Sequence, residues 1–104
     1  MDPLRAALAP LSEQIEAAFI FGSVAKGSDE ADSDLDLFVI SDGLAYSELF
    51  SALGAAEAAL GRPVNPTLMR RADWDRKRAD SASFSGRIAS QAKILVIGSQ
   101  DDVG

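Results

Sequence analysis

Residues 19–40 read FIFGSVAKGSDEADSDLDLFVI, in which two apolar runs enclose a short polar segment. The polar segment, residues 22–36, contains two glycines, one lysine and five carboxylates. Apolar runs of this length, bounded by glycine and polar residues, are typical of buried strands. A solvated hairpin loop would be equally polar, but it would not need acidic residues at alternate positions leading into the second strand. The segment is therefore a candidate binding site.

Asp34 and Asp36 stand two positions apart where the second apolar run begins. Side chains alternate across a strand, so both carboxylates should share one face while Leu35 and Leu37 point to the core. Neighbouring carboxylates repel each other, and a divalent cation relieves that repulsion. The pair is a candidate metal site. The alternative is that both side chains lie on the solvent face of an amphipathic strand.

Gly22 and Ser23 follow the first apolar run directly. Glycine allows backbone amides to turn inward and form a concave anion site. A helix that begins after Ser23 and runs through Lys26 would add its N-terminal amides, and phosphate would be bound well there. The alternative is a plain strand-to-helix turn with serine as its cap.

The composition limits the chemistry that is available. The chain has 104 residues, of which 47% are apolar and 25% charged, so we expect one globular domain over residues 1–104. It has neither cysteine nor histidine, which excludes thiolate zinc sites and histidine-based triads. Any metal should therefore be hard and bound by oxygen, such as Mg²⁺.

Charge and the N-terminal sequence indicate where the protein works. The net charge of −6 argues against tight, sequence-independent binding of nucleic acid, although nucleic acid is not excluded as an acceptor. The N-terminal residues 1–11 contain an acid, an arginine and prolines, and they fit neither a signal peptide nor a membrane span. We expect a cytoplasmic protein without a membrane contact.

Four segments have the pattern of strands, namely residues 17–21, 35–40, 62–70 and 93–98. Pro66 lacks an N–H group, which makes the third segment an edge strand or a bulged one. The strands alternate with helical patterns, so the predicted fold is α/β or α+β, a mixed four-stranded sheet packed with helices.

Apolar residues recur at helical spacing in residues 4–15 and 44–60. Pro10 should kink or split the first helix, and Gly61 should end the second. A third helical region should begin near Trp74, capped by Asp73, and should be interrupted at residues 81–86.

Two rival motifs do not fit residues 22–43. A Walker A loop requires lysine after its second glycine, but Gly27 is followed by Ser28. An EF-hand loop beginning at Asp32 would need glycine at Leu37 and glutamate at Gly43. Neither motif is therefore present.

The combined pattern resembles a known family. Gly22-Ser23, three residues, Gly27 and then Ser33-Asp34-Leu35-Asp36-Leu37 are similar to the signature of DNA polymerase β-like nucleotidyltransferases, in particular the minimal nucleotidyltransferase (MNT) domains. The pattern covers about residues 19–40, and the order of predicted elements fits that fold over a core of about residues 11–98.

The resemblance implies an activity and a site. Gly22 and Ser23 would hold the triphosphate of an NTP, with ATP the expected nucleotide, and Lys26 would contact phosphate unless it is an exposed helix lysine. Asp34 and Asp36 would bind two Mg²⁺ ions, and a nucleoside monophosphate would be transferred to a hydroxyl acceptor with release of pyrophosphate.

One position departs from the family pattern. Active members usually carry a third carboxylate on the next strand, and the corresponding residue here is Asn65. Asparagine offers a carbonyl to a metal but no negative charge and no useful base. Because a carboxylate base commonly contributes on the order of 10² to 10⁴ in rate, such a protein could be slow, could recruit another base or could bind nucleotide without turnover.

Three hypotheses follow: a nucleotidyltransferase, a weakened nucleotide-binding or antitoxin-like module that acts with a helical partner protein, and a plain α/β domain with an exposed acidic loop. The basic residues at 70, 71 and 76–78 could line the cleft, or they could form a solvated helix face paired with nearby aspartates. Trp74 and Phe84 could stack on a base, but we expect them to pack against the sheet.

Overall fold

The computed structural model describes residues 2–22, 34–80, 82–89 and 93–98. Its elements are, in chain order, α1 (Asp2–Leu8), the 3-10 helix η1 (Ala9–Gln14), β1 (Ala17–Phe21), β2 (Leu35–Ile40), α3 (Tyr46–Leu60), β3 (Val64–Met69), α4 (Arg71–Lys77), α5 (Phe84–Ala89) and β4 (Ile94–Ile97).

The four strands form one mixed sheet in the order β3-β2-β1-β4. The strand β1 runs antiparallel to both β2 and β4, whereas β2 and β3 run parallel. This confirms the predicted α+β fold with a mixed four-stranded sheet. It also confirms the edge position of the strand that contains Pro66, where the missing N–H leaves no gap inside the sheet.

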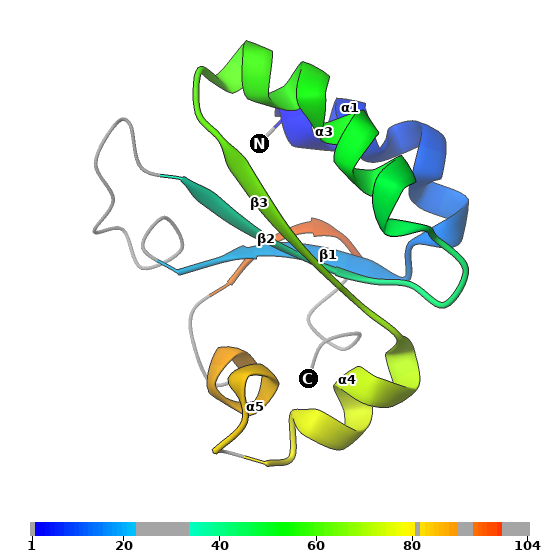
Figure 1. The fold of residues 1–104 in the computed structure, drawn as a ribbon, viewed down its shortest axis with the longest axis vertical. Coiled ribbons are helices and arrows are strands. Elements are labelled where there is room, and N and C mark those ends of the chain that lie inside the picture. Colours follow the sequence, from blue (N-terminus) through cyan, green and yellow to red (C-terminus); the bar gives the residue numbers. More distant parts are fainter. Residues whose placement is uncertain (1, 23–33, 81, 90–92, 99–104) are drawn as a thin grey trace.

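Helices cover both faces of the sheet, with α1 and α3 on one side and α4 and α5 on the other (Figure 1). The β2 side chains alternate between these layers. Leu35, Leu37 and Val39 join the core beneath α1 and α3, whereas Phe38 packs beneath α4 with Phe19 and Trp74.

The core beneath α4 is built around Trp74. Its ring lies 5.7 Å from the Phe19 ring and 5.0 Å from the Phe38 ring, and the two phenylalanine rings are stacked at 5.2 Å. The side chain of Trp74 is fully buried. The expectation that Trp74 packs against the sheet is therefore confirmed.

The first two helical regions end as predicted. The first is split at Pro10, because α1 ends at Leu8 and continues as the 3-10 helix η1. The second ends at Gly61, which adopts a left-handed conformation with φ 67° and donates its N–H to the carbonyl of Glu57.

The third helical region differs from the prediction. α4 begins at Arg71, directly after Arg70 in an extended conformation, so Asp73 lies in the first turn and is not the cap. α4 ends at Lys77 and α5 begins at Phe84, so the interruption comes earlier than residues 81–86. The Ser83 hydroxyl accepts the N–H of Gly86 at 3.0 Å, and this capping bond fixes the start of α5.

No helix among the described residues has both the length and the apolar character needed to cross a bilayer.

Candidate functional site

The acidic pair lies at the start of β2. Leu35 and Leu37 are almost completely buried, whereas Asp34 is exposed and Asp36 is half-buried. The leucines anchor the strand in the core, so the alternation of side chains turns the carboxylates away from it. Asp34 and Asp36 thus lie on the same face of the strand, as predicted.

Asn65 on β3 lies beside this pair. The parallel register of β2 and β3 places Asn65 opposite Asp36. The side-chain amide of Asn65 donates to Oδ2 of Asp34 at 3.0 Å, and its interaction with Asp36 lowers the pKa of that carboxyl. The structure therefore brings together the three polar side chains that the sequence singled out on these two strands.

Two further bonds hold the start of β3 against its neighbours. The N–H of Leu35 donates to the carbonyl of Pro63 at 2.9 Å, and the N–H of Val64 donates to Oε2 of Glu57 at 2.9 Å. The bond between Glu57 and Val64, the residue before Asn65, was not foreseen from the sequence. A single acid near the end of a helix gives no distinctive signal.

Gly22 approaches Asp36 from the end of β1. Its φ is +79°, a conformation that L side chains rarely adopt. A Cβ atom at this position would lie only 2.5 Å from Oδ2 of Asp36. The register pairs Phe21 with Asp36, so the residue that follows Phe21 must pass over the carboxylate without a side chain.

Ser23 and Lys26 lie outside the described residues, and so does the helix expected after Ser23. The structure accordingly brings Gly22, Asp34, Asp36 and Asn65 together. The phosphate contacts of Ser23 and Lys26 remain predictions.

The electrostatics of the pair favour a cation. Burial raises the pKa of Asp36 above its ordinary value of 3.8, the charge of Asp34 raises that pKa further, and the hydrogen bond from Asn65 lowers it. Two carboxylates held this close repel each other in the metal-free protein. A positive charge bound between them would stabilise both ionised forms.

The donor set suits a hard metal ion. Asp34 and Asp36 supply carboxylate oxygens, the ligands that Mg²⁺ prefers, while Asn65 contributes an amide. Among the residues described here, no group of three or more Asp, Glu, His or Cys side chains is gathered. Two carboxylates are enough where substrate phosphates complete the coordination of Mg²⁺.

The basic cluster is largely paired on the helix surface. Arg76 binds Asp73 at 2.8 Å, and Asp75 lies 3.4 Å from Arg71 and 3.8 Å from Arg78. The expected solvated, ion-paired helix face is confirmed for these three arginines.

Comparison with known proteins gives one family and several related structures. Residues 6–96 match the family described as "Polymerase beta, Nucleotidyltransferase". A search of curated proteins found no match.

Three of the similar solved structures are toxin–antitoxin structures. One, described as a toxin–antitoxin with AMP-PNP, is 21% identical with a TM-score of 0.64, and the similarity covers 97% of this chain and 75% of that one. A mutant MntA–HpeT complex with two aspartate-to-glutamate substitutions two positions apart is 19% identical with a TM-score of 0.66 and the same coverage.

A third is a tri-AMPylated HEPN toxin from Shewanella oneidensis in complex with an MNT antitoxin, 19% identical with a TM-score of 0.56, covering 97% of this chain and 71% of that one. At this level of identity the structures show a common fold. The family match extends over most of the sequence, including both aspartates and Asn65, and the chain therefore belongs to the polymerase β nucleotidyltransferase family.

Proposed function

We propose that this protein is a Mg²⁺-dependent nucleotidyltransferase, which transfers a nucleoside monophosphate from an NTP, with ATP the expected substrate, to a hydroxyl acceptor and releases pyrophosphate. The observation that carries the proposal is the close approach of Gly22 to the Asp34–Asp36 pair at the ends of β1 and β2. The relative described with AMP-PNP, an ATP analogue, supports the choice of nucleotide.

Each residue of the site has a proposed role. Asp34 and Asp36 hold the metal, and Gly22 and Ser23 hold the triphosphate, with Lys26 as a further phosphate contact. When bound, Mg²⁺ supplies charge neutralisation for the phosphates and polarises the phosphorus that is attacked. The matched spacing of the two altered aspartates in the MntA–HpeT mutant supports the assignment of Asp34 and Asp36.

Asn65 has a positioning role in this proposal. Its amide donates to Asp34, and the strand register places it opposite Asp36, so it would keep both carboxylates in place without adding negative charge. Because it cannot take a proton from the acceptor hydroxyl, the reaction should be slow unless the acceptor or a partner supplies the base.

Calorimetric titration tests the proposal. The wild-type protein should bind an NTP in the presence of Mg²⁺ and not in EDTA, whereas Asp34→Asn and Asp36→Asn should lose this binding. Glu48→Gln, an equal charge change on the first turn of α3, is the matched control and should bind normally. If the wild type and both aspartate variants bound the NTP equally well in Mg²⁺, the acidic pair would not be part of the nucleotide site.

A second function is favoured by a different observation. Tyr46 and Phe50 on α3 are 52% and 58% exposed, and their rings are stacked at 6.2 Å. Large aromatic side chains are enriched at protein interfaces. Together with Asn65, they support an antitoxin-like module of weakened activity that acts with a helical partner protein. The related structures, described as toxin–antitoxin pairs, support the expectation of a partner.

Co-expression with a small helical protein encoded by a neighbouring reading frame would test this second function. The two proteins should co-purify, and the double variant Tyr46→Ser/Phe50→Ser should weaken the complex while leaving Mg²⁺-dependent NTP binding unchanged. If the double variant co-purified as well as the wild type, the aromatic pair would not be the partner surface.

A further inference from the structure

The opposite end of the parallel strand pair carries a second polar site. β2 and β3 end together at the pair Ile40 and Met69, and the N–H of Ser41 still donates to the carbonyl of Met69 at 3.0 Å. Ser41 directly follows β2 and is five residues beyond Asp36, so about 16 Å separates this end from the acidic pair.

The chain leaves this end in two directions. After β2 it enters α3, which covers one face of the sheet, and after β3 it enters α4, which covers the other (Figure 1). In open sheets, a crevice opens beyond the carboxyl ends of parallel strands where neighbouring connections turn to opposite faces, and ligands bind preferentially there. The topology therefore predicts a binding crevice at this point.

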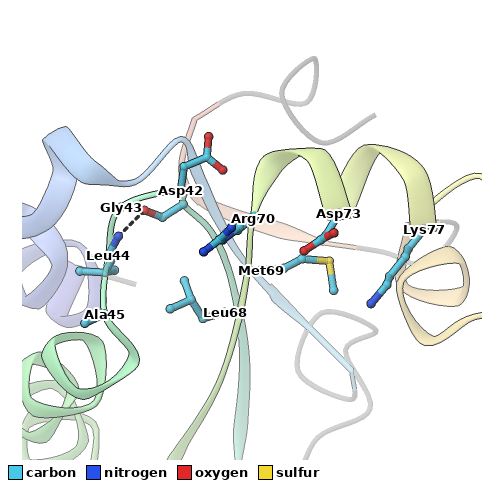
Figure 2. A pocket seen from close by; sticks show the side chains of 10 residues that line it. Asp42, Gly43, Leu44, Ala45, Leu68, Met69, Arg70, Asp73 and Lys77 are labelled. Carbon is cyan, nitrogen blue, oxygen red and sulfur yellow. Dashed lines mark hydrogen bonds between the residues drawn. The ribbon is translucent and has the colours of Figure 1, made fainter.

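A cavity of about 540 Å³ lies at this place. Its volume falls within the range of roughly 300–1,000 Å³ that is usual for small-molecule sites. Figure 2 shows the loop after β2, the end of β3 and one side of α4 around it, with Met69 between the charged side chains of Arg70 and Lys77 and Leu68 beside Arg70.

Some charged residues in this crevice have hydrogen-bond or ion-pair partners among the described residues, and others do not. Asp73 is paired with Arg76 at 2.8 Å, and Oδ1 of Asp42 accepts the N–H of Arg71 at 3.0 Å. The side chains of Arg70 and Lys77, by contrast, make no hydrogen bond or ion pair with any residue in the described part of the chain. Two cations without a partner among the described residues thus line one cavity of a protein whose net charge is −6.

We propose that this crevice binds a small organic anion whose phosphate or carboxylate group is held by Arg70 and Lys77. The guanidinium of Arg70 presents paired N–H donors that match either anion, and the ammonium of Lys77 adds a second positive charge. Leu68 and Met69 provide the apolar surface for the uncharged part of the ligand. The site is separate from the acidic pair and does not depend on the proposed transferase activity.

Titration of the ¹⁵N-labelled full chain tests the site. Inorganic phosphate and succinate are added separately in EDTA at constant ionic strength, with sodium chloride as the reference. The amides of Gly43, Leu44 and Arg70 should show saturable shifts with at least one of the two anions, and the comparison identifies which anionic group is preferred. Shifts that neither saturate nor exceed those in sodium chloride would overturn the proposal.

Substitutions test whether Arg70 and Lys77 hold the anion. Arg70→Ala and Lys77→Ala should each weaken anion binding about tenfold or more, the effect of losing one charge-assisted hydrogen bond. Arg87→Ala, an equal charge change on the exposed side of α5, and Asp34→Asn in the acidic pair should leave it unchanged. Equal affinity in Arg70→Ala, Lys77→Ala and the wild type would refute the assignment.

Discussion

Replacing Gly22 with alanine should strain the acidic site directly. The backbone has a φ of +79°, and the new Cβ would lie 2.5 Å from Oδ2 and 3.4 Å from Cγ of Asp36. The left-handed conformation costs an L residue roughly 1–2 kcal/mol. Relieving the overpacked contact costs about 1–3 kcal/mol more. The expected loss is about 2–5 kcal/mol, a large part of the roughly 5–15 kcal/mol by which domains are stable.

Two further variants separate these contributions. Gly61 also has a positive φ, +67°, but no atom lies within 4 Å of the Cβ that alanine would add. Gly61→Ala should therefore show the conformational cost alone. Asp36→Ala removes Oδ2 and Cγ and leaves Cβ at 3.7 Å, an ordinary contact distance. In that background, Gly22→Ala should cost no more than Gly61→Ala does.

Urea denaturation measures all of these costs. Trp74 is the only tryptophan in the chain and is fully buried against Phe19 and Phe38, so its fluorescence reports unfolding of the core. If Gly22→Ala and Gly61→Ala lost equal stability, or if Asp36→Ala did not relieve Gly22→Ala, the proposed contact between Gly22 and the carboxylate would be wrong.

Three other substitutions have expected outcomes. In metal-free protein, burial and Asp34 raise the pKa of Asp36 above 3.8, so its ionised form destabilises the fold at neutral pH. Asp36→Asn should then have a higher urea midpoint than the wild type at pH 7. The difference in midpoint should shrink as the pH falls through the raised pKa of Asp36 and should vanish below 3.8. A difference that stays constant with pH would contradict this. Asn65→Asp removes the donor to Asp34 and adds a third negative charge, so the melting temperature in EDTA should fall. Mg²⁺ should stabilise the Asn65→Asp variant more than it stabilises the wild type. The rate of pyrophosphate release should rise by up to about 10²–10⁴ if the new carboxylate acts as a base. An unchanged melting temperature in EDTA would argue against the observed contacts. Gly54→Ala lies in the exposed interior of α3, where the added Cβ meets no atom within 4 Å, and thermal unfolding should show a gain of about 0.5–1 kcal/mol. A loss would mean that Gly54 makes a close contact.

The sheet could be predicted from the sequence because its signals are local. The runs at residues 17–21 and 35–40 are apolar enough to be buried on both faces, and the same segments are β1 and β2. Pro66 identified an edge strand because an inner strand would lose a ladder hydrogen bond. Such features depend on single residues and their neighbours, and tertiary packing reinforces them.

The start of α4 could not be predicted in this way. Asp73 has a strong local preference for a cap, but β3 continues to Met69 and leaves only Arg70 before the helix. The end of strand β3 therefore decides where α4 begins. Asp73 instead forms an ion pair with Arg76.

The sequence predicted that Asp34, Asp36 and Asn65 would lie together, but it did not predict the contacts around them. The spacing of Asp34 and Asp36 fixes their common face, and the family resemblance pointed to Asn65. The approach of Gly22 to Asp36 depends on the register that pairs Phe21 with Asp36 across a long connection, and nothing in the local sequence determines that register.

In the proposed site, Asn65 should change how a metal is bound. With two carboxylates and a neutral amide in place of three carboxylates, the proposed site should attract Mg²⁺ less strongly in the absence of nucleotide. The phosphates of an NTP supply the missing negative oxygens, so metal and nucleotide should each bind more tightly when the other is present. Calorimetry should show weak binding of Mg²⁺ alone, weak binding of ATP in EDTA and much tighter binding of the two together. Tight binding of Mg²⁺ by the protein alone would mean that ligands beyond Asp34 and Asp36 complete the site before the nucleotide arrives.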